Sequence, residues 1–207
     1  MPRLPRRTLL AAPALLAAGS ALAQTSPDPR LAERGIGRPE APVRVLEFFS
    51  LTCSHCAAFH KETYPQVRRE LVEAGAIRLV WRDFPLDRLA LVAAQVARSM
   101  PAERYEPFIG TLLANQDRWA FTRGGDPLEE LAKMAALAGM SRAQFDAAAR
   151  DEALARAILE SRQTAEREFD VRATPTFAFQ HGGKSRTQGG NIGFDRFRLL
   201  VEEVRRA

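Results

Sequence analysis

Two cysteines three residues apart lie where a predicted strand gives way to a predicted helix. The run VRVLEFFS, residues 43–50, is rich in β-branched and aromatic residues and predicts a short buried strand. Cys53 and Cys56 follow at once, and a helical pattern continues as far as Gly75, a residue that favours a helix end. The run AIRLVWRDF, residues 76–84, predicts a second strand. A strand–helix–strand unit favours parallel strands with a right-handed crossover.

The remainder of the chain contains two segments with different sequence patterns. Pro65 falls inside the first helical pattern and should kink it. Residues 86–169 are rich in alanine and leucine with helical periodicity, and they predict four or five helices. A strand with proline at its start (174–180), a tight turn, a short return strand (185–190) and an amphipathic helix (193–207) complete the chain. We therefore expect an α/β fold whose two halves are separated by an all-helical insertion.

The first 23 residues have the three parts of an export signal. Three arginines precede an apolar stretch of residues 9–18, and Ala21 and Ala23 form a small-x-small cleavage site. The stretch is shorter than the ~20 residues that a membrane-spanning helix needs, although an uncleaved anchor is the alternative. The Arg6-Arg7 pair is also compatible with the twin-arginine route. By either route, the mature chain would reach an oxidising compartment where a cysteine pair can form a disulfide.

Composition excludes several classes of protein. Apolar residues make up 46% of the chain and charged residues 27%, which is typical of a globular domain. The formal charge is +5, and removal of the three leader arginines would leave about +2. Such a mild charge does not favour a nucleic-acid partner. Two cysteines among 207 residues cannot form a disulfide-dense scaffold.

The position of the cysteine pair predicts redox chemistry. Cys53 should lie at the helix start, where free backbone N–H groups and the helix dipole stabilise a thiolate. Cys56, one turn further in, should be less exposed and is the candidate resolving thiol. His55 adds a donor and partial positive charge beside Cys53, which would make the disulfide more oxidising.

Two other interpretations of the pair remain open. A purely stabilising disulfide would close so short a loop that it would restrict the unfolded chain little. A metal site needs further ligands: zinc takes four, or three with water. His60 could share a helix face with Cys56 and complete a soft copper site, but we interpret it mainly as a surface or packing histidine.

These motifs together resemble a known family. FFSLTCSHC followed by a helix, the long helical segment, and ATPT before a strand–turn–strand–helix ending are similar to the DsbA-like branch of the thioredoxin fold. The resemblance spans about residues 39–207. It divides the chain into a thioredoxin-like domain (43–85 and 170–207), a helical insertion (86–169) and an extended lead-in (24–42). The commonest dipeptide between the cysteines in that branch is Pro-His, whereas this chain has Ser54-His55.

The resemblance also implies roles for individual residues. Cys53 matches the nucleophilic cysteine and Cys56 the buried resolving one. Thr174-Pro175 matches a cis-proline loop that faces the disulfide and binds extended substrate; an ordinary strand proline is the alternative. Glu47 matches an acid buried behind the pair that helps to move the proton of the second cysteine. The alternative for Glu47 is exposure on one face of the strand.

The resulting expectation is a periplasmic thiol:disulfide oxidoreductase that oxidises exported proteins and is itself reoxidised by a quinone-linked partner in the inner membrane. It would need no cofactor or metal beyond the Cys53–Cys56 disulfide. A reductase or isomerase is the alternative within this chemistry, and a copper-handling binding protein is the alternative from another class. Because residues 24–42 are too short for the dimerisation domain of isomerases, we expect a monomer.

Overall fold

The computed structural model describes residues 28–207, so the predicted export signal lies outside the described residues. The sheet has five strands in the order β1-β3-β2-β4-β5. β2 and β3 are parallel, as predicted, and the other neighbouring pairs are antiparallel. The bounds of the strands are β1 Arg34–Ile36, β2 Val43–Phe49, β3 Ile77–Asp83, β4 Thr176–His181 and β5 Lys184–Gly189.

The first helical pattern is divided into three consecutive segments. α1 covers Ser54–Glu62, α2 covers Tyr64–Val67, and a π-helical turn covers Arg68–Val72. Pro65 lies in the first turn of α2, where a missing N–H costs nothing, so the predicted kink is a break after α1. Gly75 ends the segment with φ +74°, as the sequence indicates.

The insertion contains six helices between residues 88 and 168, rather than the four or five predicted. The additional element is α5, a four-residue helix directly after the long α4 that periodicity could not separate from it. Side chains of aspartate or serine cap the starts of α3, α6, α7 and α8. The bounds are α3 Arg88–Arg98, α4 Ala102–Ala114, α5 Gln116–Trp119, α6 Pro127–Leu137, α7 Arg142–Ala149 and α8 Glu152–Glu168.

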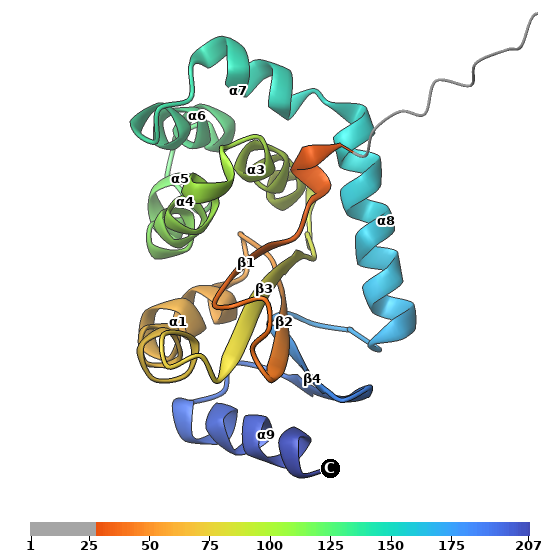
Figure 1. Ribbon diagram of the computed structural model, residues 1–207. Helices are drawn as coiled ribbons and strands as arrows, with labels where there is room; N and C mark the ends of the chain where they lie inside the picture. The colour runs from red at the N-terminus through yellow and green to blue at the C-terminus, as the bar shows by residue number, and fades with distance from the viewer. Residues whose placement is uncertain (1–27) are drawn as a thin grey trace, which may run out of the picture.

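The two faces of the sheet bury separate cores. Along β2, Val45 and Phe49 pack with α1 and the final helix α9 (Phe194–Arg206) in the larger core. Leu46 and Phe48 point the other way and pack with Ala165 of α8. Figure 1 shows α8 and α1 on opposite sides of the strands, α9 below them, and α3 to α7 gathered beyond the opposite end. The last helix of the predicted insertion therefore covers a face of the sheet.

The described part of the lead-in differs from the plain extended segment that we expected over residues 24–42. A 3₁₀ turn, Pro29–Leu31, precedes β1, which pairs antiparallel with β3 at the sheet edge. Gly35 permits this pairing, because a Cβ there would lie 2.6 Å from the carbonyl oxygen of Leu79. Only Ile36 in this short strand is a large apolar residue, so the sequence pattern gave no strand signal.

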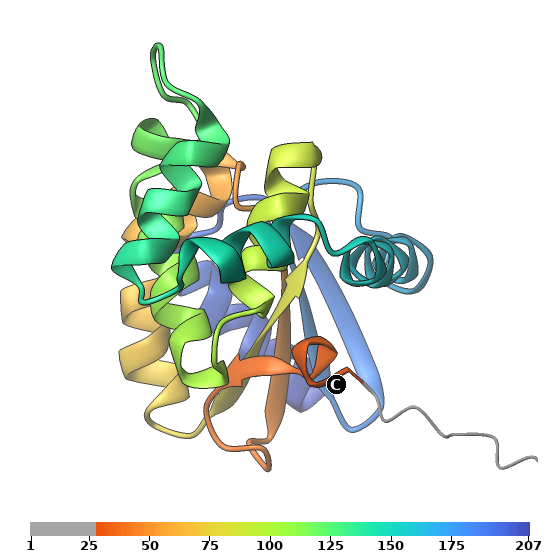
Figure 2. The same cartoon turned by 90° about the horizontal axis from the view of Figure 1, so that it is seen from above.

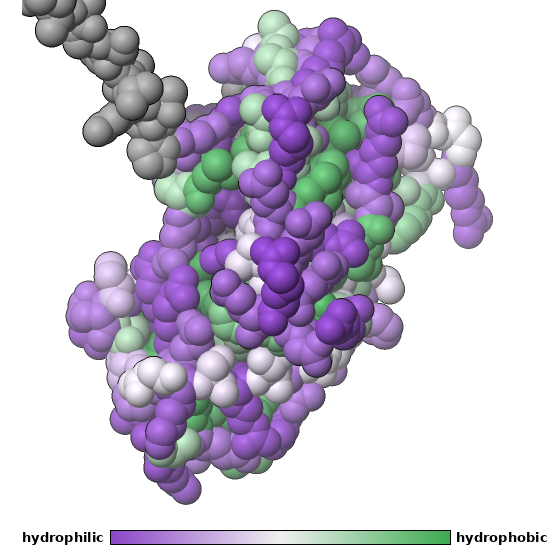
Figure 3. Space-filling view, turned by 90° about the vertical axis from the view of Figure 1, so that its right-hand side faces the viewer, coloured by the Kyte–Doolittle hydropathy of each residue, from purple (hydrophilic) through white to green (hydrophobic). Residues whose placement is uncertain are grey.

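The surface is largely hydrophilic on the face that carries α8. Figure 3 shows polar side chains over most of this face, with apolar patches between them. None of the helices in the described part of the chain has the length and apolar character of a membrane-spanning segment. Seen from above, α8 and α1 lie on opposite sides of the strands (Figure 2).

Candidate active site

Cys53 occupies the N-cap position of α1. Its backbone is extended, and its Sγ accepts a hydrogen bond of 3.4 Å from the backbone N–H of Cys56. Both cysteines are free thiols, so the structure holds the reduced form of the pair. This arrangement follows from the local sequence, because β2 ends at Phe49 and a three-residue turn brings Cys53 to the first free N–H groups of the helix.

The surroundings of Cys53 favour its thiolate. The hydrogen bond from the Cys56 thiol is the largest influence, and it helps to lower the pKa of Cys53 from 9.0 to about 5 despite partial burial, which raises it. The Thr174 side chain and the backbone N–H groups of Cys56 and His55 lower this pKa further. The buried Thr174 hydroxyl has no competing hydrogen-bond partner among the described residues, so it is available to donate to the thiolate.

Cys56 has the opposite environment. Its side chain is completely buried, and this burial is the largest cause that raises the pKa of Cys56 well above 9.0. The hydrogen bond to Cys53, the charge of Cys53 and the charge of Glu47 raise it as well. Cys53 therefore ionises readily, whereas Cys56 stays protonated. This difference is what an attacking thiol and a resolving thiol need.

The Thr174-Pro175 loop lies directly across from Cys53. The Sγ of Cys53 is 3.3 Å from the carbonyl oxygen of Thr174, although 121 residues separate them in the chain. The Thr174–Pro175 peptide bond is cis. Ser54 and His55 are exposed beside the pair. The structure thus brings together all five of these predicted residues, and it is the backbone N–H of His55 that acts on the Cys53 sulfur.

Glu47 is fully buried behind the pair, which confirms its expected burial. It shares a face of β2 with Val45 and Phe49, the face that packs against α1. Both of its oxygens contact Nε2 of His60, at 3.0 and 3.2 Å. Of the two ordinary roles expected for His60, on the surface or in packing, the structure supports packing, because its side chain is only 6% exposed and its ring stacks on Tyr64. One sequence feature indicates that His60 is buried: it lies four residues after Cys56, on the same helix face.

A second residue that the sequence analysis missed comes from the insertion. Gln116, in α5, is buried and donates from its side-chain amide to the carbonyl oxygens of Leu51 and Cys53, at 2.8 and 3.0 Å. These bonds hold the turn between β2 and α1. No local pattern identifies a glutamine 63 residues away as the partner of this turn, since the contact exists only after the insertion has packed.

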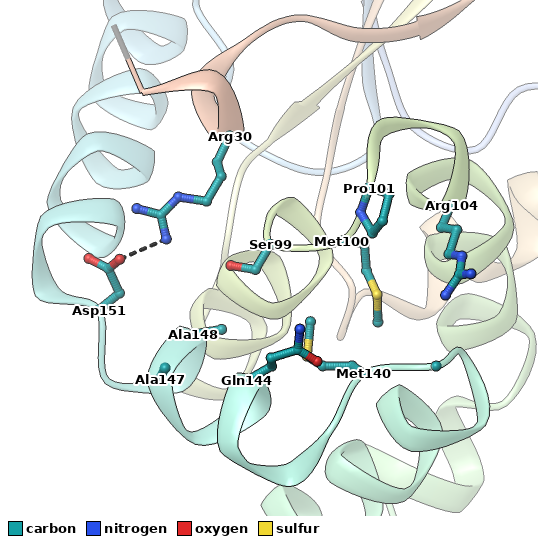
Figure 4. Close-up of a pocket in the computed structure, with 11 residues that line it drawn as sticks. Arg30, Ser99, Met100, Pro101, Arg104, Met140, Gln144, Ala147, Ala148 and Asp151 are labelled. Carbon is teal, nitrogen blue, oxygen red and sulfur yellow. Dashed lines mark hydrogen bonds and ion pairs between the residues drawn. The ribbon is translucent and has the colours of Figure 1, made fainter. Parts of the chain in front are cut away.

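Neither a metal centre nor the pocket of Figure 4 coincides with this site. Within residues 28–207, no group of three or more histidine, cysteine or acidic side chains is placed to hold a metal ion. The pocket in Figure 4, of about 380 Å³, lies between the N-terminal 3₁₀ turn and the insertion helices. Arg30 crosses one side of it to pair with Asp151 at the start of α8 (Figure 4). None of the candidate site residues lines it.

Comparisons with known proteins agree with this geometry. A protein of Rickettsia conorii that carries the name of a protein-disulfide oxidoreductase is 25% identical over 170 residues. This match covers 82% of the present chain but only 59% of that relative, so the chain spans well under two thirds of its length.

The chain is also similar to solved structures, and these matches cover nearly the whole of the solved chains. A crystal structure of alpha-DsbA1 from Wolbachia pipientis is 26% identical, with a TM-score of 0.76 over 84% of this chain and 91% of that one. BdbD from Bacillus subtilis shares the fold, with a TM-score of 0.71 at 15% identity over 84% of this chain and 94% of that one. A family model described as thioredoxin matches residues 30–201. The chain therefore belongs to the thioredoxin family, in its DsbA-like branch.

Proposed function

We propose that the protein is a thiol:disulfide oxidoreductase that introduces disulfides into exported proteins. One observation carries the proposal: the N-cap thiol of Cys53, with a pKa of about 5, lies between the buried Cys56 and the Thr174-Pro175 loop. The name of the Rickettsia relative supports the same activity. The pair itself is the redox group, and no further cofactor or metal is needed.

The proposed reaction exchanges disulfides in two steps. A substrate thiolate attacks Sγ of Cys53 in the oxidised pair, the Cys53–Cys56 bond breaks, and Cys56 leaves and takes up a proton. A second substrate thiolate then attacks the substrate sulfur of the mixed disulfide, and Cys53 leaves as a thiolate. The substrate loses two electrons and the pair gains them. The exposed Ser54 and His55 and the loop at Thr174-Pro175 border the sulfur that is attacked.

The thiolate of Cys53 supports the oxidising direction. A thiolate that is stabilised in the reduced protein makes the disulfide a stronger oxidant. At pH 7, only the part of the pKa shift that lies below the ambient pH contributes, about two units, or ~60 mV for a two-electron couple. A reductase or isomerase would use the same exchange with a reduced resting pair, and it is the second candidate.

The proposed location rests on the predicted export signal, and the proposed partners rest on the resemblance to the DsbA-like branch. The export signal at residues 1–23 supports the periplasm, reached by the general or the twin-arginine route. Exported proteins with cysteine thiols would be the substrates. A quinone-linked oxidase of the inner membrane would accept the two electrons and regenerate the disulfide. We propose a monomer without a nucleic-acid partner.

The equilibrium potential of the Cys53–Cys56 couple against glutathione tests the direction. A value near the oxidising end of the known range, about −120 mV, supports an oxidase. A value near that of thioredoxin, about −270 mV, would replace it with a reductase. Titration of the reduced protein with copper(I), beside a Cys53→Ser variant, tests the copper-handling alternative: tight binding that needs Cys53, without catalysis of disulfide exchange, would overturn the enzymatic function.

A further inference from the structure

We propose that His60 is a positioning residue that acts through Glu47 to pass the proton of Cys56 between the protein interior and solvent. The inference rests on the proposed function, because it concerns the same exchange at the cysteine pair. It assigns a role to a side chain outside the motif that contains Ser54 and His55.

The inner half of this route is a buried contact between a carboxylate and an imidazole. Glu47 on β2 is inaccessible to solvent, and the hydrogen bonds that it makes within the described residues all go to Nε2 of His60. The negative charge of Glu47 also acts on the Cys56 thiol, whose pKa it helps to raise. Glu47 therefore contacts the imidazole directly, and it acts on the resolving thiol, which is buried beside α1 on the same face of β2, through its charge.

The outer half of the route is a pocket of about 410 Å³ between α1 and α4, neighbouring helices in Figure 1. His60 lines this pocket together with Tyr64, on which its ring stacks with centroids 4.9 Å apart. Lys61, Arg68 and Glu106 place charged groups that water can reach in a lining that is otherwise largely apolar. The imidazole thus borders the buried carboxylate on one side and, on the other, a pocket that carries three charged side chains.

The chemistry of Cys56 requires such a route. In the exchange, a buried thiol with a raised pKa must gain a proton when it leaves and lose one when it attacks. When Cys56 attacks a mixed disulfide at Cys53, its proton passes to Glu47 while the Cys53–Cys56 bond forms. The bond from Cys53 to the substrate sulfur breaks, and the substrate leaves as a thiolate. The proton then moves from Glu47 to His60 and to pocket water, so atoms and electrons balance without an added oxidant.

Imidazole is suited to the middle position of this route because it has two ring nitrogens, one of which can accept a proton while the other releases one. A histidine that only neutralised a buried carboxylate would need no contact with the pocket. The titratable and charged groups that face His60 from the described elements are Glu47 on β2, Cys56 and Lys61 on α1, Tyr64 on α2, Arg68 on the π-helical turn and Glu106 on α4.

The test follows the reduced protein as it reacts with one equivalent of dithiobis-nitrobenzoate. Attack by Cys53 releases a first thionitrobenzoate, and attack by Cys56 on the resulting mixed disulfide releases a second. Stopped-flow absorbance from acid to alkaline pH gives both rates for wild type, His60→Gln, Glu47→Gln and the double variant. Glutamine at position 60 can still donate to Glu47 but cannot carry a proton. His181→Gln is the matched control, because that histidine is half-buried at the end of β4, where its ring contacts the carbonyl oxygen of Pro42 and no residue of the site.

We expect the first release to be unchanged in His60→Gln and the second to slow by about tenfold or more at neutral pH. Glu47→Gln should slow the second release similarly, and the double variant should be no slower than the slower single one. His181→Gln should behave as wild type.

A second release in His60→Gln that matches wild type at every pH would overturn the inference. The inference would also be overturned if the reduction in the second rate in the double variant equalled the product of the two single reductions, since the two residues would then act separately. His60→Phe serves as a second variant: loss of the first release in both His60 variants would show a purely structural role. If wild type itself failed to react at Cys53, the proposed function would fail instead.

Discussion

The side-chain amide of Gln116 donates a hydrogen bond of 3.0 Å to the carbonyl oxygen of Cys53. The same amide donates to the carbonyl oxygen of Leu51 at 2.8 Å. A helix of the insertion therefore holds the turn that places Cys53 at the start of α1. The insertion contributes to the geometry of the site as well as to the surface around it.

Gln116→Ala should destabilise the protein by about 2–3 kcal/mol, because two buried carbonyl oxygens would lose their donor. It should also raise the pKa of Cys53, since the thiolate depends on the position of the helix start. Urea unfolding of the reduced protein measures the first effect, and the pH dependence of alkylation by iodoacetamide measures the second.

Gln66→Ala is the control for this prediction, because Gln66 is only half-buried and its side chain bonds, among the described residues, only to the exposed Glu70. It should leave both quantities near those of wild type. A Gln116→Ala protein with wild-type stability and a wild-type Cys53 pKa would show that the insertion does not hold the turn.

The Cys56 thiol should lower the pKa of Cys53 more than the backbone N–H groups do. Cys56→Ser keeps a hydroxyl donor near the Cys53 sulfur, whereas Cys56→Ala removes it. Thiolate absorbance in the ultraviolet should therefore titrate near pH 5 in the serine variant and at clearly higher pH in the alanine variant. Equal pKa values in the two variants would assign the shift to the helix start alone.

The reduced protein should gain stability relative to the oxidised protein as the pH rises from about 5 to about 9. In this range, Cys53 is a thiolate when folded and a thiol when unfolded, so the unfolded state binds more protons. The gain should reach about 3 kcal/mol at pH 7 and disappear as the pH falls through 5. Urea unfolding of both forms across this range measures it, and a pH-independent difference would contradict the low pKa of Cys53.

Removal of Arg98 should damage the fold more than removal of an exposed arginine. Arg98 is buried, pairs with Asp83 at the end of β3, and donates to the carbonyl oxygen of Arg30 at 2.9 Å. Arg98→Met would leave Asp83 buried without its cation, with an expected loss of about 3–5 kcal/mol. Arg142→Met breaks an exposed pair with Glu129 and should change thermal unfolding little by comparison. Equal effects would contradict this reading of the buried pair.

Local sequence patterns were sufficient to locate most of the site. Cys53 and Cys56 lie at the start of α1 because a strand and a helix meet there, which short-range periodicity reveals. The otherwise apolar run around Glu47 favoured its burial, and family resemblance pointed to the roles of Glu47 and Thr174-Pro175. The strands at 43–49 and 77–83 and the break at Pro65 depend on nearby residues in the same way.

Contacts between distant segments could not be predicted, since no local pattern encodes them. β1 exists because Gly35 lets the chain approach Leu79, and its own sequence has little strand character. Gln116 reaches Cys53 only when α5 packs over the turn. The sequence by itself determined which two sulfurs react and on which helix they lie. Tertiary packing decided what surrounds them, because the pairing of His60 with Glu47 requires α1 to lie against the inner face of β2.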